Sequence, residues 1–107
     1  MNSKTFSKKA IRHGEVMIIP IDELPEGLEQ IHSGREYIVG HSETGHHHVA
    51  VGTLPDAITA YRPAGADSQY LYLKVTSKSV IEHRKTTEKH ETKTLHPGIY
   101  KVSIKNN

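Results

Sequence analysis

The sequence contains no cysteine among its 107 residues, and this absence excludes several kinds of chemistry. Disulfide bonds, thiolate nucleophiles, cysteine-ligated zinc and iron–sulfur clusters all need the missing side chain. No apolar run reaches the roughly 18 residues of a membrane-spanning helix, and the opening residues lack the apolar segment of a signal peptide. We therefore expect a soluble protein in the cytoplasm of the cell that makes it, with no membrane partner.

Hydrophobic residues are also scarce, at 35% of the chain, and the formal net charge is +2. A chain of this length forms one domain with a thin core, so an additional stabilising element, such as a bound metal, would help it to fold. We expect a flexible basic N-terminal tail over residues 1–10 and a single β domain over residues 11–107. The scattered basic residues do not favour nucleic acid as a partner, and they do not exclude it.

The hydrophobic pattern has a period of two residues, which is typical of β-strands. It is clearest over residues 70–76, where Leu71, Leu73 and Val75 alternate with Tyr70, Tyr72 and Lys74, and it returns over residues 99–105. Other strands are predicted over residues 16–19, 37–40, 46–51, 57–61 and 79–83. About seven short strands predict an all-β fold, namely a small antiparallel β-barrel or sandwich.

No stretch of a dozen residues has the period of an amphipathic helix, and residues 23–33 could hold one helical turn at most. Proline ends the predicted strand over residues 16–19. Residues 84–93 are almost entirely charged or threonine, and we expect an exposed hairpin extension or loop there.

Histidine is the residue in excess, with nine copies. His46 and His48 are two apart on a predicted strand, so both project from one face, with Cα atoms about 6.6–6.8 Å apart. Two imidazoles at this spacing can converge on one ion. His83 and His90 would supply further ligands, because a hairpin from 83 to 90 would bring them near each other. The predicted metal ligands are therefore His46, His48, His83 and His90.

Nitrogen ligands suit a divalent transition metal, with zinc, iron or manganese expected first, rather than calcium or magnesium. The nearest carboxylates are Glu43, Glu82 and Glu91, of which Glu43 and Glu82 are candidates for a general base.

The histidines can also be interpreted without a metal. Consecutive histidines in a polar loop can simply be solvated. Strand alternation places His47, Val49 and Val51 on the face opposite His46 and His48. If that apolar face is the core, His46 and His48 point outward, and a site would lie on the surface or at an interface. We expect three of the remaining histidines to be ordinary surface or turn residues, namely His13, His32 and His41. His96, just before Pro97-Gly98, could equally be an edge residue or a residue that supports a ligand.

Two segments resemble the motifs of the cupin family. Residues 40–48 (GHSETGHHH) contain a glycine, five residues and His-x-His, and residues 95–100 (LHPGIY) are similar to the Pro-Gly turn of the second motif. The resemblance implies a β-barrel that holds a metal through histidines. The sequence departs from the pattern, since no glutamate lies between Glu43 and Glu82 and no histidine follows Pro97-Gly98.

A second resemblance spans most of the chain. Residues 13–16 (HGEV), 43–49 (ETGHHHV), 71–73 (LYL) and 97–100 (PGIY) are similar, in that order, to an uncharacterised family of small proteins from tailed phages and scattered bacteria. By position, His46 and His48 match its middle histidine pair, and His83 and His90 match its late histidines. This resemblance implies a phage origin, in the host cytoplasm or the virion, but no established activity.

Three functions are compatible with the sequence. The first is a metal-binding β-protein in which the ion either activates water or stabilises a thin core. The second is a phage structural or accessory protein that self-associates as a homo-oligomer or assembly component. The third is a metal-independent nuclease in which paired histidines act as general acid and base. The residues do not decide whether the protein is an enzyme.

Overall fold

The computed structural model describes residues 10–13, 16–41, 47–64, 70–84 and 92–104. These residues form an all-β fold, as the sequence predicts. Within them the chain forms ten strands rather than about seven: β1 (Ile11–His13), β2 (Val16–Ile21), β3 (Leu28–Gly34), β4 (Glu36–His41), β5 (His47–Val51), β6 (Ile58–Pro63), β7 (Leu71–Val75), β8 (Ser79–Arg84), β9 (Thr92–Leu95) and β10 (Gly98–Ile104). The described residues contain no helix long and apolar enough to cross a membrane.

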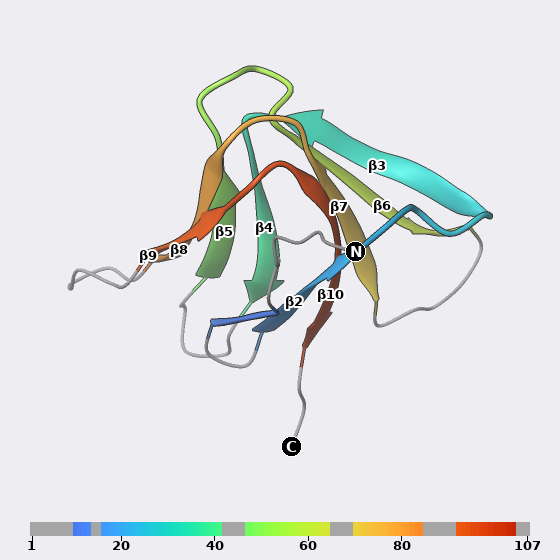
Figure 1. Cartoon of the computed structure of the whole chain (residues 1–107), viewed down its shortest axis with the longest axis horizontal. Coiled ribbons are helices and arrows are strands. Elements are labelled where there is room, and N and C mark those ends of the chain that lie inside the picture. Colours follow the sequence, from blue (N-terminus) through green and yellow to red (C-terminus); the bar gives the residue numbers. More distant parts are fainter. Residues whose placement is uncertain (1–9, 14–15, 42–46, 65–69, 85–91, 105–107) are drawn as a thin grey trace, which may run out of the picture.

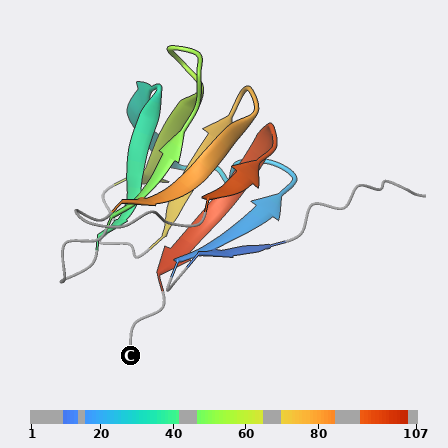
Figure 2. The same ribbon diagram turned by 90° about the vertical axis from the view of Figure 1, so that its left-hand side faces the viewer.

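The strands pair into two antiparallel sheets (Figure 1). The larger sheet has the order β1-β2-β10-β7-β6-β3, and the smaller sheet has the order β4-β5-β8-β9. Figure 2 shows the same strands from the side. The two sheets as described do not close into one barrel, because β1 and β3 are the edges of one sheet and β4 and β9 are the edges of the other. Of the two expected architectures, the structure is therefore the sandwich.

The core lies between the sheets and takes every second residue of β7 and of β10. On β7, Leu71, Leu73 and Val75 are at most 3% exposed, while Tyr72 and Lys74 face the other way. On β10, Tyr100 and Val102 are buried in the same manner. The predicted alternation is confirmed on both strands. A period of two is what lets a sheet bury one face and leave the other to solvent.

Strand β2 continues through Pro20, where the sequence predicts its end. Pro20 lies opposite Tyr100 of β10, but β1 pairs only with Val16, Met17 and Ile18. The missing N–H of Pro20 therefore falls where β2 has no partner on its β1 side. Proline in sheets is found at positions of this kind, where one side of the strand is unpaired.

Residues 23–33 do not form the helical turn considered from the sequence. Gly27 has a φ of 82° and ends the turn before Leu28, where β3 begins. Strand β3 then pairs with β6, with a register shift between Gln30 and His32. Tertiary pairing with β6 overrides a sequence that is too polar to show a strand pattern of its own.

Candidate metal centre

Strands β4, β5 and β8 bring histidine positions together at one end of the smaller sheet. The register pairs His48 of β5 directly with His83 of β8, and on its other side it pairs His48 with Gly40 of β4. Directly opposite residues of an antiparallel pair have Cβ atoms about 4.5–5.5 Å apart. Positions 48 and 83 are therefore close neighbours on one face of the sheet, and the position on β4 beside His48 has no side chain.

His48 faces the core rather than the solvent. Its side chain is 2% exposed, and Ala50, two residues further along β5, is fully buried in the core. Ile81, opposite Ala50, is fully buried as well. His48 would point outward only if the core lay on the face of His47, Val49 and Val51. The core lies instead on the face that His48 shares with Ala50.

Both faces of β5 are buried at this point, which explains why the sequence leaves the direction of His48 open. Val49 is 2% exposed although it lies on the face opposite Ala50, where it pairs with Ile38 and Glu82. Periodicity cannot choose between two apolar faces of one short strand. In the folded chain Ala50 and Ile81 lie opposite each other in the core, and His48 shares their face.

The other predicted ligands are placed only in part. For His83 the described feature is its backbone position in β8. His46, His90 and Glu43 lie outside the described residues. Among the residues that the structure does describe, no three histidine, aspartate or glutamate side chains come together in a way that could hold a metal. The structure thus brings positions 48 and 83 together and leaves the remaining ligands untested.

Glu82, a candidate general base, lies on the face of the smaller sheet opposite His48. It pairs with Val49 on one side and with Thr92 of β9 on the other. Adjacent residues of a strand point to opposite faces. Glu82 is consequently not directed at the position where His48 and His83 meet.

The hairpin expected after position 83 begins as predicted. Strands β8 and β9 are antiparallel neighbours, with Ser79 opposite Leu95 and Glu82 opposite Thr92. Thr92 and Lys93, which end the segment expected to be an exposed extension or loop, belong to the edge strand β9, whose last residue, Leu95, is fully buried. The tip of the hairpin, with His90, is outside the described residues.

His32 is a strand residue with a defined packing role, and not the surface or turn residue expected. Its ring centroid lies 4.7 Å from that of Tyr37, so it joins β3 of one sheet to β4 of the other. The Nε2 atom of His32 is buried and has no hydrogen-bond partner within the described residues. Nothing in the sequence pattern indicates this contact, because it depends on the crossing of the chain between the sheets.

His96 is exposed, and its backbone carbonyl oxygen contacts a buried side chain of the core. The hydroxyl of Tyr100 donates a hydrogen bond of 2.6 Å to the carbonyl oxygen of His96. Burial raises the pKa of Tyr100 above its ordinary value. His96 thus lies on the connection between β9 and β10, and its carbonyl oxygen anchors Tyr100.

Comparison with known proteins gives one match. A protein family described as a domain of unknown function (DUF8820) matches residues 12–105, which is most of the chain. The match agrees with the expectation of an uncharacterised family. No curated protein matches the chain. No solved structure matches it either.

Proposed function

We propose, for a chain that belongs to the family of unknown function DUF8820, that it binds a divalent transition metal through histidines of β5 and β8. The observation that carries the proposal is the direct pairing of His48 with His83 beside Gly40. Two imidazoles on one face at this separation can share one ion, and zinc, iron and manganese all accept histidine ligands.

The burial of His48 supports a stabilising ion over a solvated histidine. A side chain that is 2% exposed has lost its contact with water, and polar groups buried in this way take partners within the protein, as His48 does. An imidazole has two nitrogens, so one can bind a metal while the other makes a hydrogen bond within the protein. The small core would gain from such an ion, because metal binding to the folded state adds directly to folding free energy.

The sequence offers His46 and His90 to complete the ligand set. His46 is two residues before His48, and His90 is two residues before β9 begins. Four nitrogen ligands would saturate zinc and give a structural site, whereas three would leave a position at which water could be activated. We propose the structural role for two reasons. Glu82 faces away from His48, and the burial of His48 leaves little access for a substrate.

The experiment is a measurement of metal content by elemental mass spectrometry on untagged protein purified without a nickel column. The wild-type chain is compared with His48→Gln, His83→Gln and His96→Gln, each of which removes one imidazole and keeps a polar side chain. His96 is the matched control because it is exposed and lies on the connection between β9 and β10. Circular dichroism spectra establish that each variant is folded.

We expect about one ion per chain, or a simple fraction of it set by symmetry, in wild type and in His96→Gln. His48→Gln and His83→Gln should each lose most of it. A folded His48→Gln protein with wild-type metal content would contradict the assignment, and so would a metal-free wild type that binds no added zinc. RNA cleavage that persists in chelator would instead favour the metal-independent use of the same histidine pair.

A further inference from the structure

The outward face of the larger sheet carries aromatic and basic side chains that the proposed metal centre does not use. We call it the tyrosine–lysine face. It is defined by Tyr61 of β6, Tyr70 just before β7, Tyr72 and Lys74 of β7, and Lys101 of β10. On β7 these residues alternate with the buried Leu71, Leu73 and Val75, so they point away from the core.

The strand register places three of these side chains in one row. Tyr61 lies opposite Tyr72, and Tyr72 lies opposite Lys101. Neighbouring strands are about 4.7–4.9 Å apart, so the row extends across three strands with adjacent side chains in reach of each other. Tyr72 and Tyr61 are half-buried, while Lys74 is exposed.

Tyr70 and Lys101 form the second contact of this face. The Nζ atom of Lys101 lies 4.1 Å from the centroid of the Tyr70 ring, which is within the range of a cation–π interaction. Tyr70 is still 43% exposed. The ring holds the ammonium group in place, and an ammonium has three donors, so it can still bind an anion.

The charge on these strands has one sign. Strands β2, β6, β7 and β10 contain no aspartate or glutamate, whereas Lys74 and Lys101 lie on this face. The neighbouring edge strand β3 carries one carboxylate, Glu29, which lies opposite Arg62 of β6. Gln30, the next residue of β3, lies opposite Tyr61, so Glu29 is on the other face from Tyr61. The face therefore offers aromatic rings and cations together, without a carboxylate in its own strands.

Flat apolar rings with cations between them fit a ligand that has flat rings and negative charges. Bases stack on tyrosine rings, and lysines bind the phosphates between them. A second copy of the chain fits less well, because symmetric contact would bring Lys74 and Lys101 against the same lysines with no carboxylate in these strands. Double-stranded nucleic acid does not fit, since its bases are not free to stack on side chains.

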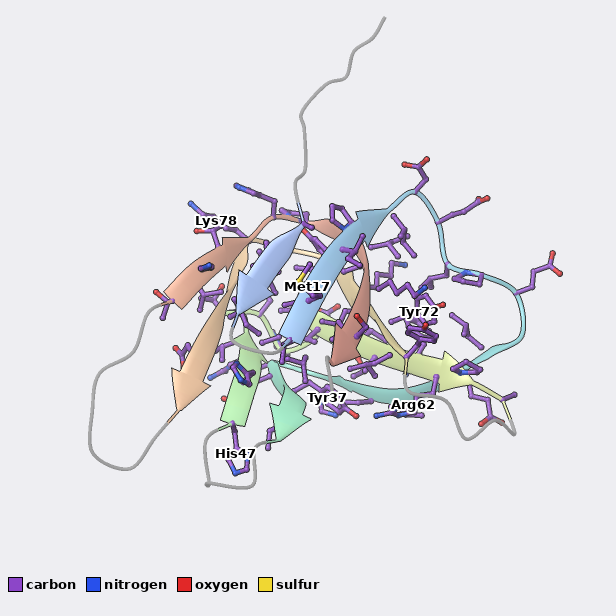
Figure 3. All side chains as sticks on the ribbon, turned by 90° about the horizontal axis from the view of Figure 1, so that it is seen from below. Met17, Tyr37, His47, Arg62, Tyr72 and Lys78 are labelled. Atoms are coloured by element: carbon purple, nitrogen blue, oxygen red, sulfur yellow. The ribbon has the colours of Figure 1, made fainter. Side chains whose placement is uncertain are left out.

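We propose that the tyrosine–lysine face binds single-stranded nucleic acid, with bases stacked on Tyr72 and its neighbouring tyrosines and phosphates bound by Lys101 and Lys74. Tyr72 and His47 are well separated in Figure 3, so this surface is distinct from the histidine end of the smaller sheet. Binding here does not depend on metal binding there. The lysines of this face are scattered in the sequence, and the strand register brings them beside the tyrosines, so the basic residues alone do not indicate this nucleic-acid surface.

The test is fluorescence anisotropy with a fluorescein-labelled 15-residue oligodeoxythymidine, titrated with wild-type protein at several salt concentrations. Tyr72→Leu removes the ring but keeps an apolar strand residue, and it should weaken binding about tenfold, the factor expected for one stacked base. Tyr72→Phe keeps the ring and should bind like wild type. Lys101→Gln should weaken binding and lower the slope of log K against log salt by about 0.7, the value for one phosphate contact on a single strand.

Lys78→Gln is the matched charge control. Lys78 is exposed on the connection from β7 to β8, well away from Tyr72 in Figure 3, and its loss changes the net charge by the same amount. It should bind the oligonucleotide nearly as wild type does. The proposal is overturned if wild type shows no binding at low salt, if Lys78→Gln matches Lys101→Gln, or if Tyr72→Leu has no effect. Sedimentation that shows a dimer abolished by Tyr72→Leu would assign the face to a second copy instead.

Discussion

His48 of β5 and His83 of β8 occupy directly opposite positions in an antiparallel strand pair, at the end of the sheet where both strands carry their histidines. They are 35 residues apart in sequence, the difference between positions 83 and 48. An ion held between them would link the two central strands of the smaller sheet. Loss of the ion should therefore lower the stability of the whole fold.

The first prediction concerns the stability that a metal adds. Zinc at about 100 times its dissociation constant should stabilise the folded chain by about 2.7 kcal/mol. For a domain of this size that corresponds to a rise in melting temperature of about 10–20 °C. His48→Gln should show little or no rise, and His96→Gln should show the full rise. Thermal melts followed by circular dichroism, with and without chelator, measure it; an equal rise in His48→Gln would contradict the site.

The sequence predicts well those strands whose partners bury one face. Leu71, Leu73 and Val75 show the alternation because the core takes that face and solvent takes the other. The sequence predicts β3 poorly, because its residues are mostly polar and it becomes a strand through its pairing with β6. The alternation of residues along a strand shows that one of its faces is buried. Pairing between strands that are distant in the sequence leaves no such pattern in either strand.

The candidate site divides in the same way. The sequence indicates that His46 and His48 share a face, which follows from the spacing of a strand. It names His83 as a partner, and the register places position 83 beside His48. It cannot show that His48 is buried, because Val49 and Ala50 are both apolar and either could have faced the core. That outcome depends on packing against Ile81, which is distant in the sequence.

The second prediction concerns the connection between β5 and β6. A Cβ atom at Gly52 would lie 2.3 Å from Ala57 Cβ and 2.7 Å from Ser79 Oγ, closer than real atoms approach. The Gly52 N–H also donates to the Arg35 carbonyl oxygen at 2.8 Å, which restricts any backbone movement away from the contact. Gly52→Ala should thus lower the free energy of unfolding by about 1–3 kcal/mol, as overpacking does.

Urea denaturation measures the effect of Gly52→Ala. Thr53→Ala is its control, since Thr53 is the exposed next residue. This variant should stay within about 0.5 kcal/mol of wild type. Ser79→Ala in the Gly52→Ala background removes the oxygen at 2.7 Å and should recover part of the loss. A Gly52→Ala protein as stable as wild type would show that the connection can shift freely.

The third prediction concerns the contact between the sheets at His32. A Cβ atom at Gly34 would lie 3.0 Å from His32 Nε2 and 3.2 Å from His32 Cε1, so the ring occupies the space above the glycine. The ring is also fixed by Tyr37, at 4.7 Å between centroids. Gly34→Ala should therefore destabilise the fold, by about 1 kcal/mol for a modest overpacking.

A double-mutant cycle separates this contact from other effects of the substitutions. In the His32→Ala background, Gly34→Ala should cost much less, because the ring that it would meet is absent. Neither variant should change the metal content, since His32 lies on β3 of the larger sheet. Equal costs in the two backgrounds, measured by urea denaturation, would show that Gly34 and His32 do not interact.

The fourth prediction concerns alkaline stability. Burial of Tyr100 raises its pKa, and its hydroxyl donates a hydrogen bond to the His96 carbonyl oxygen that the ionised form cannot make. In the unfolded chain the hydroxyl ionises near its ordinary value of about 10. Between that value and the higher pKa of the folded state, only the unfolded chain has lost the proton. The stability that Tyr100 contributes is therefore fully present below about pH 10 and is lost as the pH rises further.

Tyr100→Phe removes both the ionisation and the hydrogen bond. At neutral pH it should lower the free energy of unfolding by about 0.5–1.5 kcal/mol, the worth of one hydrogen bond. Above about pH 10 its stability should fall less steeply than that of wild type, so that the two curves approach each other. Tyr70→Phe, at an exposed position, should keep the wild-type slope. Urea denaturation from pH 8 to pH 11 decides the matter, because parallel curves for wild type and Tyr100→Phe would exclude Tyr100 as the source of the alkaline loss.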